Sequence, residues 1–235
     1  MNNNNRNSAF WPSYVDIMTT LFAIMLILFA VSFGKFSKEK GELELKEKRL
    51  LEFEEKYNEI KSIYQVVENI NPEYFEFNKQ FVKHIFKIQV TYQTGAFELN
   101  KLQADVLGNK NEAESLRSKI VDAGKEIQMT IEKLQQNDSI KQDIKYLVVI
   151  EGQASADGYN EDAYRNNDVL SYQRALGLHN FWKKNGIDFS NMNKCELVIS
   201  GSGEKGVPRD DSNEKNNQRF LIHIVPVIGN IKLDN

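Results

Sequence analysis

The feature that most constrains this chain is an apolar run of membrane length that contains one acid. Residues 11–33 read WPSYVDIMTTLFAIMLILFAVSF, and Asp16 is the charged residue among them. At 1.5 Å per residue, such a helix crosses a bilayer core of about 30 Å. An acid at membrane depth costs roughly 2.5–3.5 kcal/mol, and chains that retain one commonly use it to carry an ion or a proton. Position alone leaves two interpretations of Asp16 open: an ion carrier, and an interfacial residue that snorkels out or caps the helix.

The ends of the run favour a transmembrane helix over residues 11–33. Pro12 suits the first turn of a helix, and Trp11 and Tyr14 suit the interfacial belt of a membrane. A cleaved signal peptide is the alternative, with Ala30-Val31-Ser32 as the cleavage site. The length of the apolar region and its early acid argue against that alternative.

The charges that flank the run leave its orientation open. Residues 1–10 form a short tail with Arg6 as its charged side chain, whereas lysines and glutamates alternate soon after residue 34. Taken literally, the positive-inside rule would place the C-terminal side in the cytoplasm. The bias is weak, and long domains can cross a membrane regardless of their charge.

The composition excludes several classes of function. A net charge of −3 at pH 7 offers no basic surface for nucleic acid. The single cysteine, Cys195, excludes an intramolecular disulfide. The histidines are scattered, and no Cys/His cluster has metal-ligand spacing, so no metal site is predicted. Neither a nucleophile–base set nor a phosphate-binding loop is present in the sequence, so we expect neither enzymatic activity nor a bound cofactor.

Residues 34–71 are rich in Glu and Lys and are predicted to form a charged helical linker. Apolar side chains recur there with heptad spacing: Leu43, Leu50, Tyr57 and Tyr64 in one set, and Phe53, Ile60 and Val67 in the other. This alternation is typical of the seam of a parallel, dimeric coiled coil, and it also fits a helix packed on its own domain. Asn71-Pro72 is expected to end the helix.

Residues 72–235 are predicted to form an α+β domain. The expected strands are residues 86–92, 146–152, 197–200 and 220–225, and the expected helices are residues 112–134 and 168–184. The order βαβαββ predicts one mixed sheet with helices on one face. Residues 201–217 read as a long polar loop, and loops of that length are often functional.

Four segments of this domain resemble OmpA-like peptidoglycan-binding domains, over roughly residues 85–228. Residues 152–158 (GQASADG) and 167–175 (NDVLSYQRA) are similar to the family pattern G-H-T-D-x-x-G … N-x-x-L-S-x-x-R-A. Residues 201–208 resemble its G-x-G-E-x-x-P loop, and residues 217–220 resemble its terminal N-R-R-V. The resemblance implies an OmpA-like fold that binds peptidoglycan through Asn167, Leu170, Arg174 and Arg219.

One departure from the pattern concerns the acid of the H-T-D segment, where this chain has Ser155. In the family, that Asp pairs with the amine of the diamino acid in the peptidoglycan stem, while the helix Arg binds its carboxylate. Arg174 remains, and its planar guanidinium can donate two parallel hydrogen bonds to a carboxylate. Asp157 is the candidate substitute for the missing acid if the loop has a different shape. A fold that is retained without binding is the alternative.

The N-terminal run also carries a resemblance. Trp11, Tyr14, Asp16, Met18 and Thr19 form a W-x-x-Y-x-D-x-M-T pattern that is similar to the transmembrane helix of MotB-type stator subunits. In those proteins the Asp carries the ions that drive rotation, so the resemblance implies that Asp16 carries protons, although the sequence does not exclude sodium.

Further implications follow from this resemblance for the environment of Asp16 and for its partners. Tyr14, Thr19 and Thr20 are candidate ion-path residues. Two copies of the chain are expected inside a ring of MotA-like partners, by resemblance five around two. The protein is expected in the bacterial inner membrane, with its N-terminus in the cytoplasm and residues 72–235 in the periplasm.

Two stator-like families fit this architecture, flagellar stators and the MotB-like B component (ZorB) of Zorya anti-phage defence systems, whose partner is the MotA-like ZorA. Flagellar members commonly have a longer basic N-terminus than residues 1–10, which favours the Zorya-like interpretation. A passive wall-binding anchor remains an alternative of a different class. The ExbD/TolR group also has a membrane helix with an essential Asp, but its periplasmic domains are smaller and lack the N-x-x-L-S-x-x-R-A helix.

Overall fold

The computed structural model describes residues 10–137 and 144–228, and its contacts divide the chain into one unit up to Tyr57 and a second unit from Asn58. α1 (Phe10–Glu68) is one uninterrupted helix that joins the predicted membrane span to the predicted linker. Within the described residues, it is the one helix long and apolar enough to cross a membrane, and its apolar window is fully exposed.

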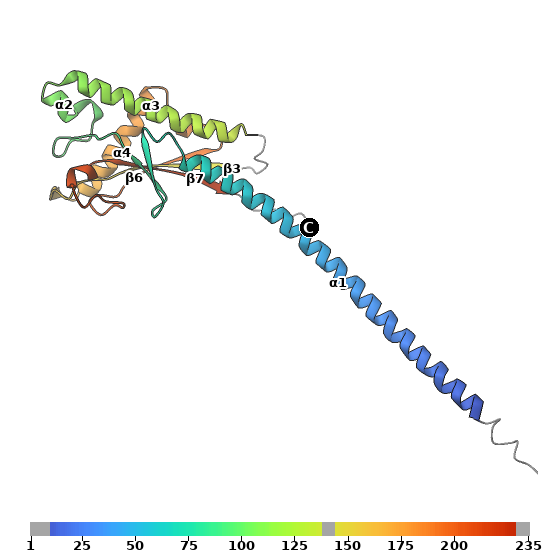
Figure 1. The fold of residues 1–235 in the computed structure, drawn as a ribbon. Helices are drawn as coiled ribbons and strands as arrows, with labels where there is room; N and C mark the ends of the chain where they lie inside the picture. Colours follow the sequence, from blue (N-terminus) through green and yellow to red (C-terminus); the bar gives the residue numbers. More distant parts are fainter. Residues whose placement is uncertain (1–9, 138–143, 229–235) are drawn as a thin grey trace, which may run out of the picture. The chain divides into compact units, whose positions relative to one another are not determined.

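The second unit is built on a five-stranded mixed sheet with the strand order β1-β2-β7-β3-β6 (Figure 1). The strands are β1 (Phe75–Asn78), β2 (Lys83–Phe86), β3 (Ile144–Gly152), β6 (Cys195–Gly201) and β7 (Phe220–Ile228). β3 and β6 are parallel, with Gly152 opposite Gly201, and the other neighbours are antiparallel. Because parallel neighbours need a crossover, α4 (Asn167–Lys184) connects β3 to β6. The carboxyl ends of these two strands therefore lie beside the start of α4.

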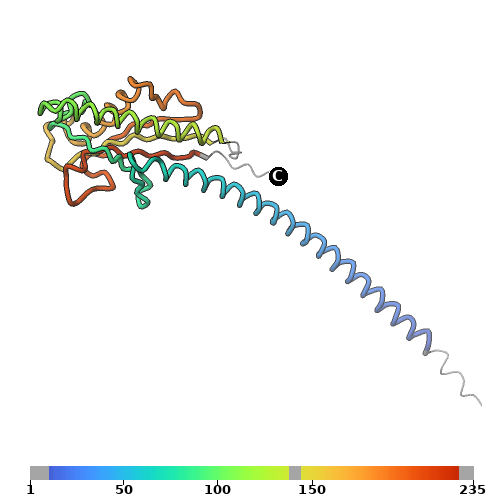
Figure 2. Tube along the Cα trace, turned by 45° about the horizontal axis from the view of Figure 1, so that its top comes forward, coloured from blue at the N-terminus to red at the C-terminus, as the bar shows by residue number. Residues whose placement is uncertain are grey.

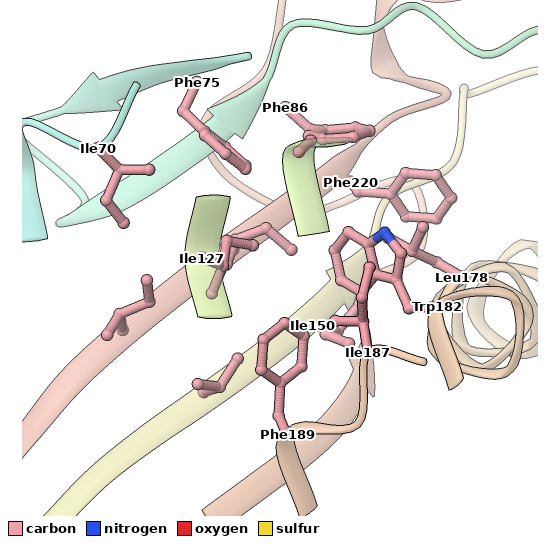
Figure 3. Close-up of a cluster of buried hydrophobic side chains, with 14 of the residues drawn as sticks. Ile70, Phe75, Phe86, Ile127, Ile150, Leu178, Trp182, Ile187, Phe189 and Phe220 are labelled. Atoms are coloured by element: carbon pink, nitrogen blue, oxygen red, sulfur yellow. The ribbon is translucent and has the colours of Figure 1, made fainter. Parts of the chain in front are cut away.

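The core lies on one face of the sheet (Figure 3). The buried positions of β3 alternate, as one side of a pleated strand requires: Ile144, Tyr146, Val148 and Ile150. Ile127 of α3 (Lys110–Gln135) and Trp182 of α4 belong to the same cluster as these side chains. The α+β fold class, with a mixed sheet and helices on one face, is confirmed.

α3 and α4 are held together by one tryptophan. α3 runs along the sheet in Figure 2, and its buried residues recur at helical spacing, among them Ile120 and Ile127. The indole nitrogen of Trp182 donates a hydrogen bond of 2.7 Å to the carbonyl oxygen of Ile120. A Cβ atom at Gly124 would lie 2.6 Å from that nitrogen, so a glycine is needed where the indole crosses α3.

The prediction of a strand at residues 86–92 is wrong except for its first residue. β2 ends at Phe86 because its partner β7 begins at Phe220, which leaves the following residues without a ladder. Residues 87–91 still alternate between exposed and buried side chains, which is the pattern that predicts a strand. Strand-like periodicity therefore persists here without strand pairing.

Several short elements complete the second unit. They are η1 (Leu99–Lys101), α2 (Gln103–Val106), η2 (Phe189–Asn191), η3 (Glu214–Asn217) and the two strands of a hairpin, β4 (Asn160–Asp162) and β5 (Arg165–Asn166). The β1–β2 and β4–β5 hairpins are additions to the predicted βαβαββ order. The helices and the other three strands occur where they are predicted, with bounds that differ by a few residues.

The last turns of the predicted linker belong to the core of the second unit. Ile63, Val67 and Ile70 are buried in the main apolar cluster. The Nε2 atom of His84 lies 2.9 Å from the carbonyl oxygen of Val67, to which its N–H can donate. The C-terminal part of the heptad pattern is therefore used within the chain.

Candidate functional site

The loop that leaves β3 places an acid beside the start of α4. Asp157 accepts hydrogen bonds from the backbone N–H of Tyr159 at 3.1 Å and from the side-chain amide of Asn167 at 3.2 Å. The hydroxyl of Ser155 donates to the other carboxylate oxygen of Asp157 at 3.1 Å. Ser155 itself is not an acid, unlike the residue at this position in the OmpA-like pattern. Its hydroxyl orients the carboxylate of Asp157, two residues later.

α4 presents one stripe of buried side chains to this loop. Asn166 caps the helix by accepting a hydrogen bond of 3.0 Å from the backbone N–H of Val169. Asn167, Leu170 and Arg174 are all buried, and their spacing of three, four and seven residues places them on one face of the helix. Of these three predicted residues, Asn167 contacts Asp157 directly, and Arg174 interacts electrostatically with it.

Asn167 holds the polar end of this stripe and has an unused acceptor. Only 5% of the residue is exposed, and its amide nitrogen also lies 3.4 Å from a carboxylate oxygen of Glu204. Its oxygen is buried without a hydrogen-bond partner in the described part of the chain. A buried acceptor without a partner costs about 1–3 kcal/mol, so a ligand that donates to it would recover that energy.

Arg174 is the charged group at the other end of the stripe. It is 3% exposed, its Nε donates to the carbonyl oxygen of Ala96 at 3.1 Å, and its guanidinium carbon lies 4.5 Å from the ring centroid of Tyr92. None of the described carboxylates forms an ion pair with it. Burial lowers the pKa of Arg174, while Tyr92 and the charge of Asp157 oppose that shift.

Tyr92 contacts Arg174 and is a residue that the sequence motifs do not identify; we call the cluster of Asp157, Asn167, Arg174 and Tyr92 the candidate pocket. Burial raises the pKa of Tyr92 far above its ordinary value, and its buried hydroxyl has no partner among the described residues. A guanidinium over a tyrosine ring is a favourable cation–π arrangement. Within the described residues, the oxygen of Asn167 and the hydroxyl of Tyr92 are therefore buried without a partner, and Arg174 is a buried cation without a carboxylate, with the negative charge of Asp157 nearby.

Close packing fixes α4 on the ends of the strands. A Cβ atom at Gly152 would collide with the carbonyl oxygen of Ser171, so the helix can approach β3 only where this glycine stands. The hydroxyl of Ser171 accepts a hydrogen bond of 2.9 Å from the backbone N–H of Gly203. These contacts place the 201–217 loop beside the first turns of α4. They explain why small residues stand at positions 152 and 171.

Arg219 lies in a different environment from Arg174. Its Nε donates to the side-chain oxygen of Gln153 at 2.9 Å, and one terminal nitrogen donates to the carbonyl oxygen of Pro208 at 2.8 Å. Gln153 is fully buried and donates in turn to Gly206 and Pro208. The geometry assigns both side chains to holding the 201–217 loop, and ligand contact by Arg219 stays a prediction.

A second buried charge cluster lies on the sheet face opposite the core. Glu151 is 6% exposed and accepts from Lys83 at 2.9 Å and from His223 at 2.8 Å. Burial by itself raises the pKa of Glu151, but the hydrogen bonds from His223 and Lys83 outweigh it and lower the pKa to about 2. Lys83 also donates to the carbonyl oxygen of Val207 at 2.9 Å, so the cluster pins the long loop to the sheet.

The predicted ion-path residues lie on α1. The hydroxyl of Thr20 donates to the backbone carbonyl oxygen of Asp16 at 2.8 Å, and that of Thr19 donates to Val15 at 2.6 Å. Both hydroxyl oxygens keep lone pairs that can accept from an ion or a protonated acid. The rings of Trp11 and Tyr14 meet edge to face at 6.5 Å.

Comparison with known proteins gives matches at the level of structure. No family model and no curated sequence matches this chain. The periplasmic domain of Helicobacter pylori MotB shares 14% identity, with 65% of this chain and 87% of that chain covered at a TM-score of 0.39.

Two further solved structures lie in the same range of similarity. A putative MotB like protein from Desulfovibrio vulgaris shares 16% identity, over 73% of this chain and 92% of that chain, at a TM-score of 0.36. The peptidoglycan-associated lipoprotein from Burkholderia pseudomallei shares 12% identity, over 58% of this chain and 88% of that chain, at a TM-score of 0.35. These values describe similarity only. The function proposed below is based on Asp157, Asn167, Arg174 and Tyr92.

Proposed function

We propose that this chain is a membrane-anchored, peptidoglycan-binding subunit of an ion-driven motor. The observation that carries the proposal is that one face of α4 and the loop before it hold Arg174 and the oxygen of Asn167, both buried and without a carboxylate or hydrogen-bond partner, respectively, among the described residues, together with the carboxylate of Asp157. Opposite charges at two ends of one pocket suit a ligand that carries both an ammonium and a carboxylate. The diamino acid of a peptidoglycan stem carries both groups at the free end of its side chain.

The roles of the pocket residues follow from their chemistry. Arg174 would bind the ligand's carboxylate through its terminal nitrogens, because its Nε already donates to Ala96. Asp157 would accept a hydrogen bond from the ammonium, and the oxygen of Asn167 would accept a second hydrogen bond from the same group. Ser155, which donates to Asp157, would keep that carboxylate aimed into the pocket.

A pull-down with purified sacculi tests wall binding. The detergent-solubilised full chain should co-sediment with sacculi, and Arg174→Ala should reduce the bound fraction at least tenfold. Arg49→Ala, which removes an exposed arginine from α1, is the matched control and should bind as the wild type does. Equal binding by Arg174→Ala and wild type would remove the assignment of this pocket.

The motor part of the proposal rests on Asp16 and its exposed helix. A deprotonated Asp16 in the bilayer would need a partner surface, and protonation would remove that need, so the helix could move relative to a MotA-like ring. The proposed assembly has five such partners around two copies of this chain, in the inner membrane with residues 72–235 in the periplasm. A reporter fused after Asn235 that proved cytoplasmic would overturn this orientation.

The second copy has a natural contact surface on α1. Leu43, Leu50, Phe53 and Tyr57 share the heptad pattern, and each is more than half exposed, whereas Val67 at the end of the same pattern is buried in its own domain. We assign the exposed part, residues 43–57, to a coiled coil between two copies. Chemical cross-linking at Leu50→Cys should join two chains in membranes.

The biological setting that fits best is Zorya-type anti-phage defence, with a ZorA-like partner, and flagellar-type motility is the alternative. A phage-protection assay and a motility assay separate the two. A passive wall anchor, the third candidate, would tolerate Asp16→Ala in either assay but would lose function in Arg174→Ala.

A further inference from the structure

The β4–β5 hairpin, residues 160–166, has no role in the pocket chemistry described above. Its residues are exposed except Asn166, and Tyr164 at its tip is 81% exposed. A tyrosine offers a large, rigid, amphipathic surface at a small cost in conformational entropy. The question is what this ring, held away from the core, can contact.

Hydrogen bonds and ion pairs fix the conformation of the hairpin. One carboxylate oxygen of Asp162 accepts from the backbone N–H groups of Tyr164 and Arg165, each at 2.8 Å. The guanidinium of Arg165 pairs with Asp162 at 2.7 Å and with Glu161 at 2.9 Å. These contacts pair the one cation of the hairpin with its two acids, leaving a net charge of −1, and hold the tyrosine backbone in one position.

The base of the hairpin adjoins Asn167, a residue of the candidate pocket. The backbone N–H of Asn167 donates to the carbonyl oxygen of Tyr159 at 3.1 Å, which closes the hairpin onto the start of α4. The hydroxyl of Tyr159 lies 3.4 Å from the position of a Cβ atom at Gly95, next to Ala96, whose carbonyl oxygen binds Arg174. The hairpin is therefore tied at both strands to groups that line the pocket.

We infer that Tyr164 is a sugar-stacking platform that contacts the glycan strand of peptidoglycan while the pocket holds the stem peptide. This inference rests on the proposed wall-binding function. Three residues from base to tip extend the hairpin by about 10 Å at 3.3 Å per residue. The diamino acid is the third residue of the stem and would be held by the free end of its side chain, so two residues, a lactyl group and that side chain separate the held groups from the sugar, roughly 12–16 Å. The side chain of Tyr164 adds roughly 6 Å to the reach of the hairpin, so the two lengths are comparable.

The chemistry of the tip fits a sugar better than an acidic or basic partner. The apolar face of a pyranose ring packs on an aromatic ring, and its hydroxyl groups form hydrogen bonds with polar side chains nearby. Asn160, which lies opposite Asn166 at the base of the hairpin, is exposed and can supply an amide. The guanidinium of Arg165 is already paired with Asp162 and Glu161, so the hairpin offers no free cation to an acidic partner.

Two probes separate this inference from the function on which it rests. The first is the free stem tripeptide that contains diaminopimelate, and the second is the same tripeptide linked to its disaccharide. The full chain in detergent should bind the second probe roughly five- to tenfold more tightly than the first. Tyr164→Ala should lower the affinity for the second probe to that for the first and should leave the first unchanged. Tyr164→Phe, which keeps the ring, should bind both probes as the wild type does.

The controls give each remaining outcome a meaning. Phe36→Ala, which removes an exposed aromatic ring from α1 outside residues 43–57, should change neither affinity. Equal wild-type affinity for the two probes, or a Tyr164→Ala variant that still prefers the disaccharide, would overturn the glycan contact and leave the pocket intact. Arg174→Ala should lose both probes. If the wild type binds neither probe, the proposed wall binding and the inference built on it both fail.

Discussion

The guanidinium carbon of Arg174 lies 4.5 Å from the ring centroid of Tyr92, and this buried cation has no carboxylate partner among the described residues. A buried charge is normally paired with an opposite charge, because desolvation without pairing is costly. The ring supplies part of the compensation. In the proposed function, the remainder would come from the carboxylate of a bound ligand.

Arg174→Lys should separate charge from geometry. A lysine keeps the positive charge but cannot donate two parallel hydrogen bonds to a carboxylate. It also has no planar group to stack on the ring of Tyr92. We expect affinity for the stem tripeptide to fall roughly tenfold, about 1.4 kcal/mol, with a smaller loss than in Arg174→Ala. Isothermal titration of the full chain measures both values. An affinity for Arg174→Lys equal to that of the wild type would show that charge alone is recognised.

Asp16→Asn should abolish motor activity and leave the complex assembled. An amide is neutral at every pH, so the variant resembles the protonated acid permanently and cannot cycle between two charge states. Phage protection or motility reports activity, and co-purification with the MotA-like partner reports assembly. Thr20→Val, which removes a hydroxyl bonded to the Asp16 carbonyl oxygen, should cause a partial loss. Normal activity in Asp16→Asn would end the carrier assignment.

The stability of the second unit should fall in acid. The carboxyl of Glu151 titrates near 4.5 when unfolded and near 2 when folded, so its contribution is complete above about pH 5 and is lost as the pH falls towards 2. Burial lowers the pKa of His84, so below about pH 6.5 protonation of the unfolded state acts in the same direction. Urea unfolding in detergent, followed by tryptophan fluorescence, measures the effect.

Glu151→Gln is the variant that identifies the source of this pH dependence. It should flatten the loss of stability between pH 5 and pH 2 because its side chain does not titrate in that range. Glu196→Gln on β6, which removes an exposed acid, should leave the profile unchanged. A wild-type profile that is flat over this interval would contradict the role assigned to the Lys83–Glu151–His223 cluster.

Gly124→Ala should destabilise the second unit although alanine is the better helix former. Alanine gains about 1 kcal/mol of helix propensity, but its Cβ atom would lie 2.6 Å from the Trp182 Nε1 atom. Overpacking of that kind costs roughly 1–3 kcal/mol, so we expect a net loss of up to about 2 kcal/mol in the free energy of unfolding. Gly41→Ala has open space around its Cβ atom and should cause no loss. Equal stability of the two variants would show that the indole shifts freely.

Much of the fold could be predicted from periodicity and stop signals. Residues 146–150 form a continuous apolar run within a strand, and residues 168–184 form a helix that ends at Asn185-Gly186, so both elements are recognisable locally. Residues 87–91 show the limit of this reasoning. Their alternation is strand-like, but pairing depends on where β7 begins, which is a property of the tertiary structure.

The pocket was predictable where a residue's role depends on its own helix face. Asn167, Leu170 and Arg174 fall on one face by spacing alone. Tyr92 and the Glu151 cluster were not predictable, because their partners are distant in sequence and only the folded chain brings them together. Arg219 matches a motif, but its bonds to Gln153 and Pro208 follow from the path of the 201–217 loop.

The most direct test of the account is the affinity of the full chain for the diaminopimelate-containing stem tripeptide, measured by isothermal titration for wild type and Asp157→Asn. The amide keeps an oxygen that can accept from Tyr159 and Asn167, so the loop should stay folded, but it offers no charge to an ammonium. The account predicts binding by the wild type and a loss of tenfold or more in Asp157→Asn. Equal affinity in the two proteins would contradict the assignment of Asp157 and with it the two-charge pocket.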